Sequence, residues 1–348
     1  MRSTTLIILA AVTVPVFAAA VFVPTPGGTT SATVVSAPVL PGLKDKIAMA
    51  AKLTITTGSG TVTLEHKGAA AKPGEAPVDG WTLADKGGYP VDPATIKPIL
   101  SGLVELKTVE PKTDRPKLYD RLDLADPSVK GSEAKALALT DAGGADLAKL
   151  IVGRRRYGLT GNDDGLYVRK PGEARTWLAA PAFDVPADVL SWIDRKLVDI
   201  EADKIKSVTL TPAAAGSKPL AFARAAAADK LAVQDLPKDF KLKSDNPGSD
   251  VAPAFRYLDL TDVKPAVAVT AAPVATAHVE TFDGTQLDVT LIEQDGGTWV
   301  EFQAKGGDAA AEIVKRTNGW AYKIPDARVK TLETKLADLA APPPAKGS

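Results

Sequence analysis

The chain has 348 residues, 45% of them hydrophobic, which is enough apolar material for two domains with cores of ordinary size. Its 42 Lys and Arg balance 42 Asp and Glu, so no net charge attracts nucleic acid and we expect no nucleic-acid partner. Cysteine is absent, which excludes disulfides, zinc-thiolate sites and cysteine nucleophiles. Any Ser-His-Asp relay, and most zinc sites, would need one of only two histidines.

Residues 1–23 predict an N-terminal transmembrane anchor or signal sequence. After Arg2, the 18 residues from Leu6 to Val23 carry no charge. As a helix this run would be roughly 27 Å long, about the thickness of bilayer hydrocarbon. No Lys or Arg follows until Lys44, so the positive-inside rule places the rest of the chain outside the cytoplasm. A cleaved signal peptide is the alternative, because 18–20 (AAA) resembles a cleavage site. We favour the uncleaved anchor because the apolar run continues to Val23.

The next segment, residues 24–43, has the composition of a stalk. It reads PTPGGTTSATVVSAPVLPGL and is rich in Pro, Gly, Ser and Thr. Such a stalk would hold the folded part away from the membrane. Residues 341–348, APPPAKGS, are predicted to be a disordered tail.

Similar phrases recur in the two halves of the remaining chain. DKIAMAAKLTIT from Asp45 parallels DKIKSVTLTP from Asp203, and RLDLADP from Arg121 parallels YLDLTDV from Tyr257. The front of the second copy is about twenty positions shorter. We therefore predict two tandem copies of one unit, at 44–202 and 203–340.

Period-2 alternation around glycine turns predicts antiparallel hairpins in each copy. Three stretches show it: KLTITTGSGTVTLEHKG (52–68), ALALTDAGGADLAKLIVG (136–153) and HVETFDGTQLDVTLIEQDGGTWVEFQA (278–304). Turns this short cannot make a parallel crossover, so the strands should form meanders.

Three further segments begin with a tryptophan, turn at a proline and continue with apolar residues at helical spacing. We expect Trp81, Trp177 and Trp320 to be buried packing residues, the alternative being a ring exposed at a binding groove. The predicted helical stripes are Ile96, Ile99, Leu100, Leu103 and Leu106; Val189, Leu190, Ile193, Leu197 and Ile200; and Val329, Leu332, Leu336 and Leu339. The predicted fold class is α+β, with two tandem repeats of an antiparallel sheet covered by amphipathic helices, preceded by one N-terminal transmembrane helix.

The text from Leu150 to Leu210 resembles a known family. It includes LIVGRR, GLYVRKPGEARTWLAA and WIDRKLVDIEADKIKSVTL. A later phrase, GWAYKIPDARVKTLETKLADL at 319–339, resembles the common ending of the same family. These phrases are similar to the DUF4340 family of uncharacterised bacterial proteins, and the resemblance extends over about residues 44–340. It implies a single-pass protein of the bacterial inner membrane with its body in the periplasm. It also implies an association with ABC-type export permeases, including those linked to gliding motility.

Candidate catalytic or metal-binding residues are few, and each has a plainer interpretation. His66 and His278 lack a second histidine or a nearby carboxylate at ligand spacing, so we assign neither a role. GNDDG at Gly161–Gly165 lacks the order of a calcium loop and is interpreted as a hairpin turn. AKGGDAAAE at Ala304–Glu312 lacks the lysine of a phosphate-binding loop, and we expect a short helix from Asp308.

One basic cluster is a possible partner-contact patch. It combines Arg154, Arg155 and Arg156, expected at a strand end, with Arg169 and Lys170 on the neighbouring strand. Such a patch could meet phosphate headgroups or an acidic protein face. A charged sheet edge that prevents aggregation is an equally good interpretation.

These observations favour a non-enzymatic, membrane-anchored accessory protein. Its expected partners are the membrane, through residues 6–23, and an ABC-type permease or another envelope protein. No catalytic, cofactor-binding or metal-binding residue is assigned. The alternative is a periplasmic module that holds an envelope polymer or small molecule in a groove lined by exposed Trp192 or Trp299. An enzyme that uses only carboxylates, as glycosidases do, would need two of them about 5–9.5 Å apart in a cleft.

Overall fold

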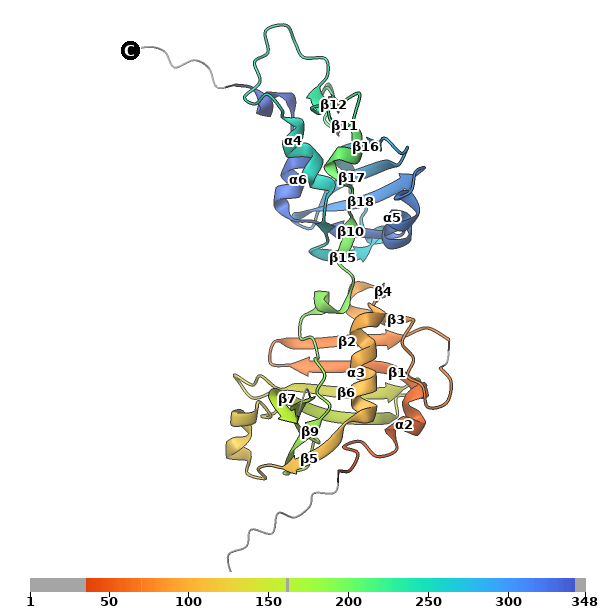
Figure 1. The fold of residues 1–348 in the computed structure, drawn as a ribbon, viewed down its shortest axis with the longest axis vertical. Coiled ribbons are helices and arrows are strands. Elements are labelled where there is room, and N and C mark those ends of the chain that lie inside the picture. The colour runs from red at the N-terminus through yellow and green to blue at the C-terminus, as the bar shows by residue number, and fades with distance from the viewer. Residues whose placement is uncertain (1–35, 70, 161–162, 342–348) are drawn as a thin grey trace, which may run out of the picture.

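The protein consists mainly of two large antiparallel sheets arranged end to end (Figure 1). The computed structural model describes residues 36–69, 71–160 and 163–341. The predicted transmembrane segment lies outside these residues, and among them no helix is long and apolar enough to cross a membrane. The predicted tail also lies outside them, apart from Ala341.

The first sheet has nine strands in the order β4-β3-β2-β1-β6-β7-β8-β9-β5. Each hairpin forms where the sequence alternates, and the turn of β1 and β2 closes at the Thr57–Gly60 pair. The strands are β1 (Ala50–Thr57), β2 (Gly60–His66), β3 (Trp81–Leu83), β4 (Tyr89–Pro90), β5 (Lys107–Pro111), β6 (Lys135–Asp141), β7 (Asp146–Thr160), β8 (Asp163–Arg169) and β9 (Thr176–Ala180).

The second sheet has eight strands in the order β13-β12-β11-β16-β17-β18-β19-β15. The two sheets share a strand order. The run β2-β1-β6-β7-β8-β9-β5 of the first sheet corresponds, strand by strand, to the run β12-β11-β16-β17-β18-β19-β15 of the second. The strands are β11 (Ile205–Pro212), β12 (Leu220–Ala223), β13 (Ala232–Val233), β15 (Asp262–Pro265), β16 (Pro273–Thr281), β17 (Gln286–Gln294), β18 (Gly297–Lys305) and β19 (Trp320–Lys323). A separate two-stranded sheet pairs β10 (Lys196–Val198) with β14 (Leu258–Asp259).

The helices are few and mostly short, which corrects the predicted α+β class to a mainly β fold. The longest, α3, starts with Asp92 as its N-cap and lies across one face of the first sheet (Figure 1). The α-helices are α2 (Leu43–Lys46), α3 (Pro93–Glu105), α4 (Gly248–Val251), α5 (Ala310–Thr317) and α6 (Asp326–Leu332). The 3-10 helices are η1 (Ile47–Met49), η2 (Ala84–Lys86), η3 (Pro116–Leu122), η4 (Val189–Trp192), η5 (Ala202–Lys204), η6 (Ala252–Phe255), η7 (Ala266–Ala268) and η8 (Leu336–Leu339).

Of the three predicted helical stripes, only the first is one helix. The stripe from Ile96 to Leu103 lies on α3, and all four of its residues are buried. The second prediction is wrong, because Val189–Trp192 forms a 3-10 turn and Lys196–Val198 forms a strand. The third stripe is divided, since α6 ends at Leu332 and η8 begins at Leu336.

Two other expectations about chain organisation need correction. The end of the predicted stalk belongs to the folded part, because Val39 donates from its backbone to Leu106 and Leu43 is buried. The two LDL phrases are also not equivalent in the fold. The first, in 121–127, ends η3 and continues into a loop, whereas the second, in 257–263, forms β14 and enters β15.

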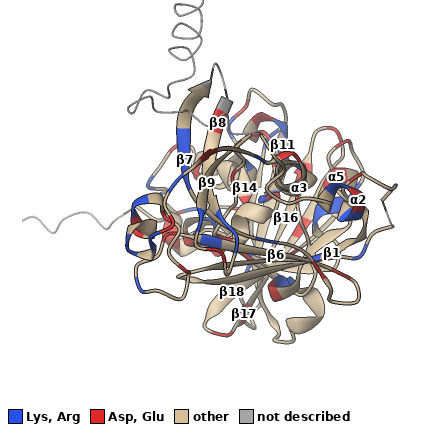
Figure 2. Cartoon of the chain, turned by 90° about the horizontal axis from the view of Figure 1, so that it is seen from below, with Lys and Arg blue, Asp and Glu red and all other residues tan. Residues whose placement is uncertain are grey.

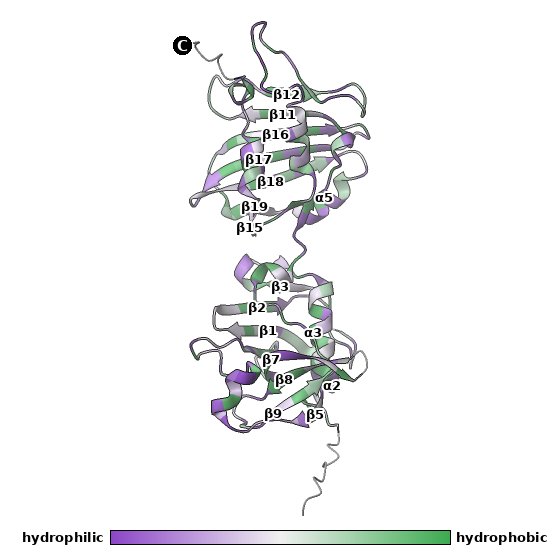
Figure 3. Ribbon diagram, turned by 60° about the vertical axis from the view of Figure 1, so that its left-hand side comes forward, coloured by the Kyte–Doolittle hydropathy of each residue, from purple (hydrophilic) through white to green (hydrophobic). Residues whose placement is uncertain are grey.

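Alternating burial along the strands gives one hydrophobic core that runs through both sheets. Figure 3 shows apolar and polar residues alternating along the strands, as expected for sheets with one covered face. Trp81 is fully buried and donates its indole N–H to Pro77. Trp177 and Trp320 are only half-buried, so the expectation of three buried tryptophans holds for Trp81 alone.

The two sheets meet where β4 faces β15. Tyr89 stacks edge-on against Trp320 at 4.8 Å between ring centroids, and Lys86 forms a 2.6 Å ion pair with Asp262. Gly87 lies so close that a Cβ there would be 2.5 Å from the Pro265 ring. Pro90 and Pro265 sit on the facing edges, and proline cannot donate to a ladder, which keeps the two sheets from merging.

Candidate functional site

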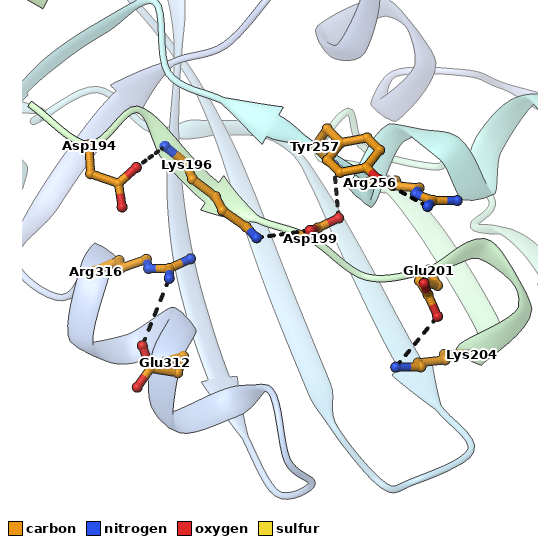
Figure 4. Close-up of polar contacts among 9 residues, drawn as sticks. All are labelled: Asp194, Lys196, Asp199, Glu201, Lys204, Arg256, Tyr257, Glu312 and Arg316. Carbon is orange, nitrogen blue, oxygen red and sulfur yellow. Dashed lines mark hydrogen bonds and ion pairs between the residues drawn. The ribbon is translucent and has the colours of Figure 1, made fainter. Parts of the chain in front are cut away.

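The candidate site is a surface over the two-stranded sheet, which we call the β10–β14 surface. It comprises Asp194, Lys196, Asp199, Glu201, Lys204, Arg256, Tyr257, Glu312 and Arg316 (Figure 4). The inward side chains of its two strands, Leu197, Val198 and Leu258, are buried. β10 lies before the predicted boundary at residue 202, yet it pairs with β14 of the second unit, and the burial of these three side chains fixes both strands there.

A chain of polar contacts connects the two strands of this surface. The backbone N–H of Lys196 donates to Asp194 at 2.9 Å, and its ammonium donates to Asp199 at 2.9 Å. The other carboxylate oxygen of Asp199 accepts from the backbone N–H of Tyr257 at 3.3 Å. The Lys196 hydrogen bond, aided by that backbone N–H, lowers the pKa of Asp199. Asp199 is therefore a charged group that positions the backbone of Tyr257.

Tyr257 has an unusual backbone for an aromatic residue. Its φ is 48°, in the left-handed region, and its side chain is 64% exposed. A bulky residue at positive φ costs free energy, and such positions cluster at functional sites. Phe255 and Leu258 are both buried, so burial on either side places Arg256 and the strained Tyr257 at the surface.

Arg256 completes the exposed platform around this ring. Its guanidinium carbon lies 4.8 Å from the centroid of the Tyr257 ring, and its Nη2 donates to the Tyr257 hydroxyl at 3.1 Å. The backbone of the platform is held from behind, because Arg328 donates to the carbonyls of Pro253 and Arg256. The result is an arginine stacked on an exposed tyrosine, and both residue types are enriched in the energetic centres of protein interfaces.

The remaining charges of the β10–β14 surface are matched. Glu201 lies 3.6 Å from Lys204, and Glu312 lies 3.9 Å from Arg316 on α5. A surface with paired charges of both signs has no field that would select a phosphate-rich partner. Its chemistry fits a protein face better than a nucleic acid or a headgroup layer.

The predicted basic patch does not form as one surface. Arg154–Arg156 lie inside the long strand β7 (Asp146–Thr160) rather than at its end. Figure 2 shows a blue band of basic residues on this strand. Arg154 pairs with Asp123, and Arg155 with Asp164 and Asp184.

The other two members of that patch lie elsewhere. Arg169 is 8% exposed, stacks on Tyr119 and donates to the carbonyl of Leu124, so it is a structural residue. Lys170 pairs with Glu173 in the turn before β9. A partner contact by Arg154–Arg156 stays a prediction, whereas Arg169 is removed from it.

The two histidines and the GNDDG turn have local partners, and the glycine stretch at Ala304–Glu312 leads into a helix. His66 contacts the carbonyl of Asp79 at 2.9 Å and packs on Trp81. His278 contradicts the expectation of no nearby carboxylate, because Asp288 on the next strand lies 2.6 Å away. Of GNDDG, Gly161 and Asn162 lie outside the described residues, and Asp164 accepts from the N–H of Gly158 in the β7–β8 hairpin. The glycine stretch before α5 leads to a helix that begins at Ala310 rather than Asp308.

The alternative function required a ligand groove lined by exposed Trp192 or Trp299, and neither ring is exposed. Trp192 is 0% exposed and Trp299 is 5% exposed, so neither ring can line an open groove. Trp299 instead lies beneath Lys264 and Lys323. The sequence analysis did not identify Arg256 and Tyr257. The signal available for them was the stretch FRYL (255–258), in which these two residues stand between two strongly apolar ones.

Comparison with known families identifies the chain. A family model described as a domain of unknown function, DUF4340, matches residues 81–264, which is 184 of 348 residues. The chain belongs to the DUF4340 family. The matched range is shorter than the expected 44–340, and it runs from β3 into β15, so the DUF4340 match includes β10, β14 and Tyr257. No curated protein matches the chain.

Proposed function

We propose that this DUF4340 protein is a non-enzymatic accessory protein of the bacterial inner membrane. In this proposal residues 6–23 hold it at the membrane, its body lies in the periplasm, and it is an auxiliary component of an ABC-type transport system. The family resemblance supports the transport system, and the uncharged run at the N-terminus supports the membrane attachment.

The observation that carries the proposal is the exposed ring of Tyr257 with the half-buried Arg256 stacked on it. An isolated protein gains nothing from holding a tyrosine at φ 48° with its ring in water. A partner that covered the ring would bury a large apolar area on a side chain that is already ordered. The β10–β14 surface is therefore the proposed contact with the permease or another envelope protein.

The internal similarity of the two units supports a scaffold rather than two separate activities. Both sheets start with the same irregularity, a register shift at Ala50/Lys52 in β1 and at Ile205/Ser207 in β11. We infer that the units are tandem copies. Their end-to-end arrangement makes a long body, since nine and eight strands spaced about 4.8 Å apart add up to roughly 70–80 Å.

The test is recovery of partners from gently solubilised membranes with the tagged full chain. We expect the wild type to recover a permease and its ATPase, and Tyr257→Ala to recover much less. Val267→Ala is the control, because Val267 is 89% exposed on η7 and belongs neither to the β10–β14 surface nor to the Arg154–Arg156 segment. Equal recovery by both variants would contradict the assignment of the contact to the β10–β14 surface, and no recovery by the wild type would contradict the accessory function.

A further inference from the structure

The described chain begins at the end of the molecule opposite β12 (Figure 1), and a second surface feature lies there. It is a groove of about 1130 Å³ between the segment from Ser36 to Lys44, the C-terminal half of α3 and the loop Gly74–Val78. We call it the N-terminal groove. It is larger than a typical pocket for a drug-sized ligand, which has about 300–1,000 Å³.

The walls of the N-terminal groove are mainly apolar. Leu40 comes from the N-terminal segment, Ala76 and Val78 come from the loop, and Val104 comes from α3. All four are half-buried, with part of each side chain open to the groove. Val109 on β5 extends this apolar lining and is 38% exposed. Such a long apolar lining suits a flexible hydrocarbon chain better than a compact polar solute.

The charged residues around the groove favour an anionic ligand. Lys44, Lys97 and Lys107 line it, all three are exposed, and none forms an ion pair with a described residue. Glu75 and Glu105 also line it, so one positive charge is in excess. The lysines of the β10–β14 surface, by contrast, are matched by carboxylates.

The short link between the predicted anchor and the N-terminal groove limits how far the groove can lie from the membrane. The apolar run ends at Val23 and the groove begins at Ser36, so 12 residues (24–35) separate them. Twelve residues span at most about 40 Å, at roughly 3.4 Å each. Because the groove lies at the end of the body to which these residues connect, it is the part of the body that reaches the bilayer surface most easily.

We propose that the N-terminal groove binds one acyl chain of an anionic membrane phospholipid, with the headgroup among Lys44, Lys97 and Lys107. The apolar walls would replace the lipid environment of the chain, and the lysines would pair with the phosphate and any anionic headgroup. This inference rests on the proposed membrane attachment. It adds a specific lipid contact to an attachment that would otherwise depend on residues 6–23 alone.

The test places the full chain in lipid bilayer discs that contain phosphatidylglycerol with a photoreactive group at the end of one acyl chain. After illumination, mass spectrometry locates the lipid adducts along the sequence. We expect adducts in 36–47, 74–78 and 97–109, in addition to those in 6–23. Adducts confined to 6–23 would overturn the groove proposal, leave the membrane attachment intact and point to a peptide as the occupant. A complete lack of adducts would overturn the membrane attachment as well.

Variants of the groove walls and lysines sharpen the result. Val104→Trp should fill the groove and abolish its adducts while those in 6–23 persist, and Ala76→Leu fills it from the opposite wall in case the first variant fails to fold. Val314→Trp is the control, because Val314 is 38% exposed on α5 in the other unit. Replacing the three lysines with glutamine should remove the preference for phosphatidylglycerol over phosphatidylcholine. Unchanged groove adducts in both filled variants would overturn the proposal.

Discussion

The two units use the same framework to build different surfaces. In each, the segment that enters the unit pairs with the residues directly after the covering helix. In the first unit Pro38 pairs with Lys107 after α3, and in the second Lys196 pairs with Asp259 after η6. The N-terminal groove lies beside the first pairing and the β10–β14 surface beside the second.

The covering helix accounts for the difference between these surfaces. In the first unit α3 is continuous over 13 residues, and its end forms one wall of the groove. In the second unit the covering segment is divided into α4 and η6, each of four residues. Proline alone does not account for the division, because α3 continues through Pro98 while Pro253 lies in the first turn of η6. The chain leaves η6 with Arg256 half-buried and Tyr257 exposed. The sheets are therefore the common support, and the segment that covers each sheet determines which surface the unit presents.

The strongest test of this equivalence compares two buried leucines. Leu106 and Leu258 follow the covering helix of their units and are both 0% exposed. Replacing either with alanine should lower the free energy of unfolding by about 2–5 kcal/mol, because each deletion leaves a cavity in the core. Urea denaturation followed by circular dichroism measures both values. A loss near zero at one position would show that the two sites are not equivalent.

The next test concerns the helix that differs between the units. The Asp92 carboxylate accepts from the N–H of Ala94 at 2.8 Å, whereas α4 has no side-chain cap. Asp92→Ala should cost about 0.5–2 kcal/mol of stability and loosen the first unit specifically. Asp326→Ala is the control, because Asp326 begins α6 without making a cap hydrogen bond. Hydrogen exchange should show faster exchange in α3 for Asp92→Ala only, and equal effects of the two variants would contradict this assignment.

The sequence was informative where local chemistry determines structure. Alternation around Gly58 and Gly284 predicted their hairpins correctly, because a glycine turn and a period of two leave little choice of register. The stripe at 189–200 failed because apolar periodicity reports burial and not conformation. Its residues Ile193, Leu197 and Ile200 are buried as expected, but Val189–Trp192 forms a 3-10 turn and pairing with β14 makes Lys196–Val198 a strand.

The candidate sites depend on contacts that local sequence does not reveal. Arg169 looked like a surface residue, yet Tyr119, fifty positions earlier, provides a ring at 4.6 Å that keeps it buried. The N–H of Tyr257, whose φ is 48°, donates to Asp199, which lies 58 positions away. The N-terminal groove needs three separate segments, one of which was interpreted as stalk.

A smaller effect should report how the two units are joined. Among the described residues, Lys86–Asp262 is the one ion pair that connects the two sheets, and its side chains are 25% and 32% exposed. A double-mutant cycle with Lys86→Met and Asp262→Asn should give a coupling of about 1 kcal/mol, above that of most exposed pairs. The control cycle at Asp146–Lys149, where both side chains are half exposed, should give less. A coupling no larger than the control would mean that Tyr89, Trp320 and the prolines join the units without help from charge.

The smallest expected effect distinguishes the turns that follow β6 and β16. After β16, Asp283 accepts hydrogen bonds from Thr281, from the N–H of Asp308 and from Thr285, and these bonds lower its pKa to about 2. After β6, the Asp141 carboxylate accepts from the N–H groups of Gly143 and Ala145, both in its own turn.

Because the folded pKa of Asp283 is depressed, its stabilising effect is fully present above the unfolded pKa near 3.8 and is lost as the pH falls toward 2. Asp283 is exposed, so solvent screening reduces the contribution to less than about 1 kcal/mol. Asp283→Asn should therefore flatten the fall in stability between pH 4 and pH 2, measured by urea denaturation across that range. Asp141→Asn is the comparison, since its turn does not reach a distant segment such as the start of α5. If Asp283→Asn left the acid dependence unchanged, the turn would be held by its threonines and glycines alone, and the two turns would not differ in the way their hydrogen bonds indicate.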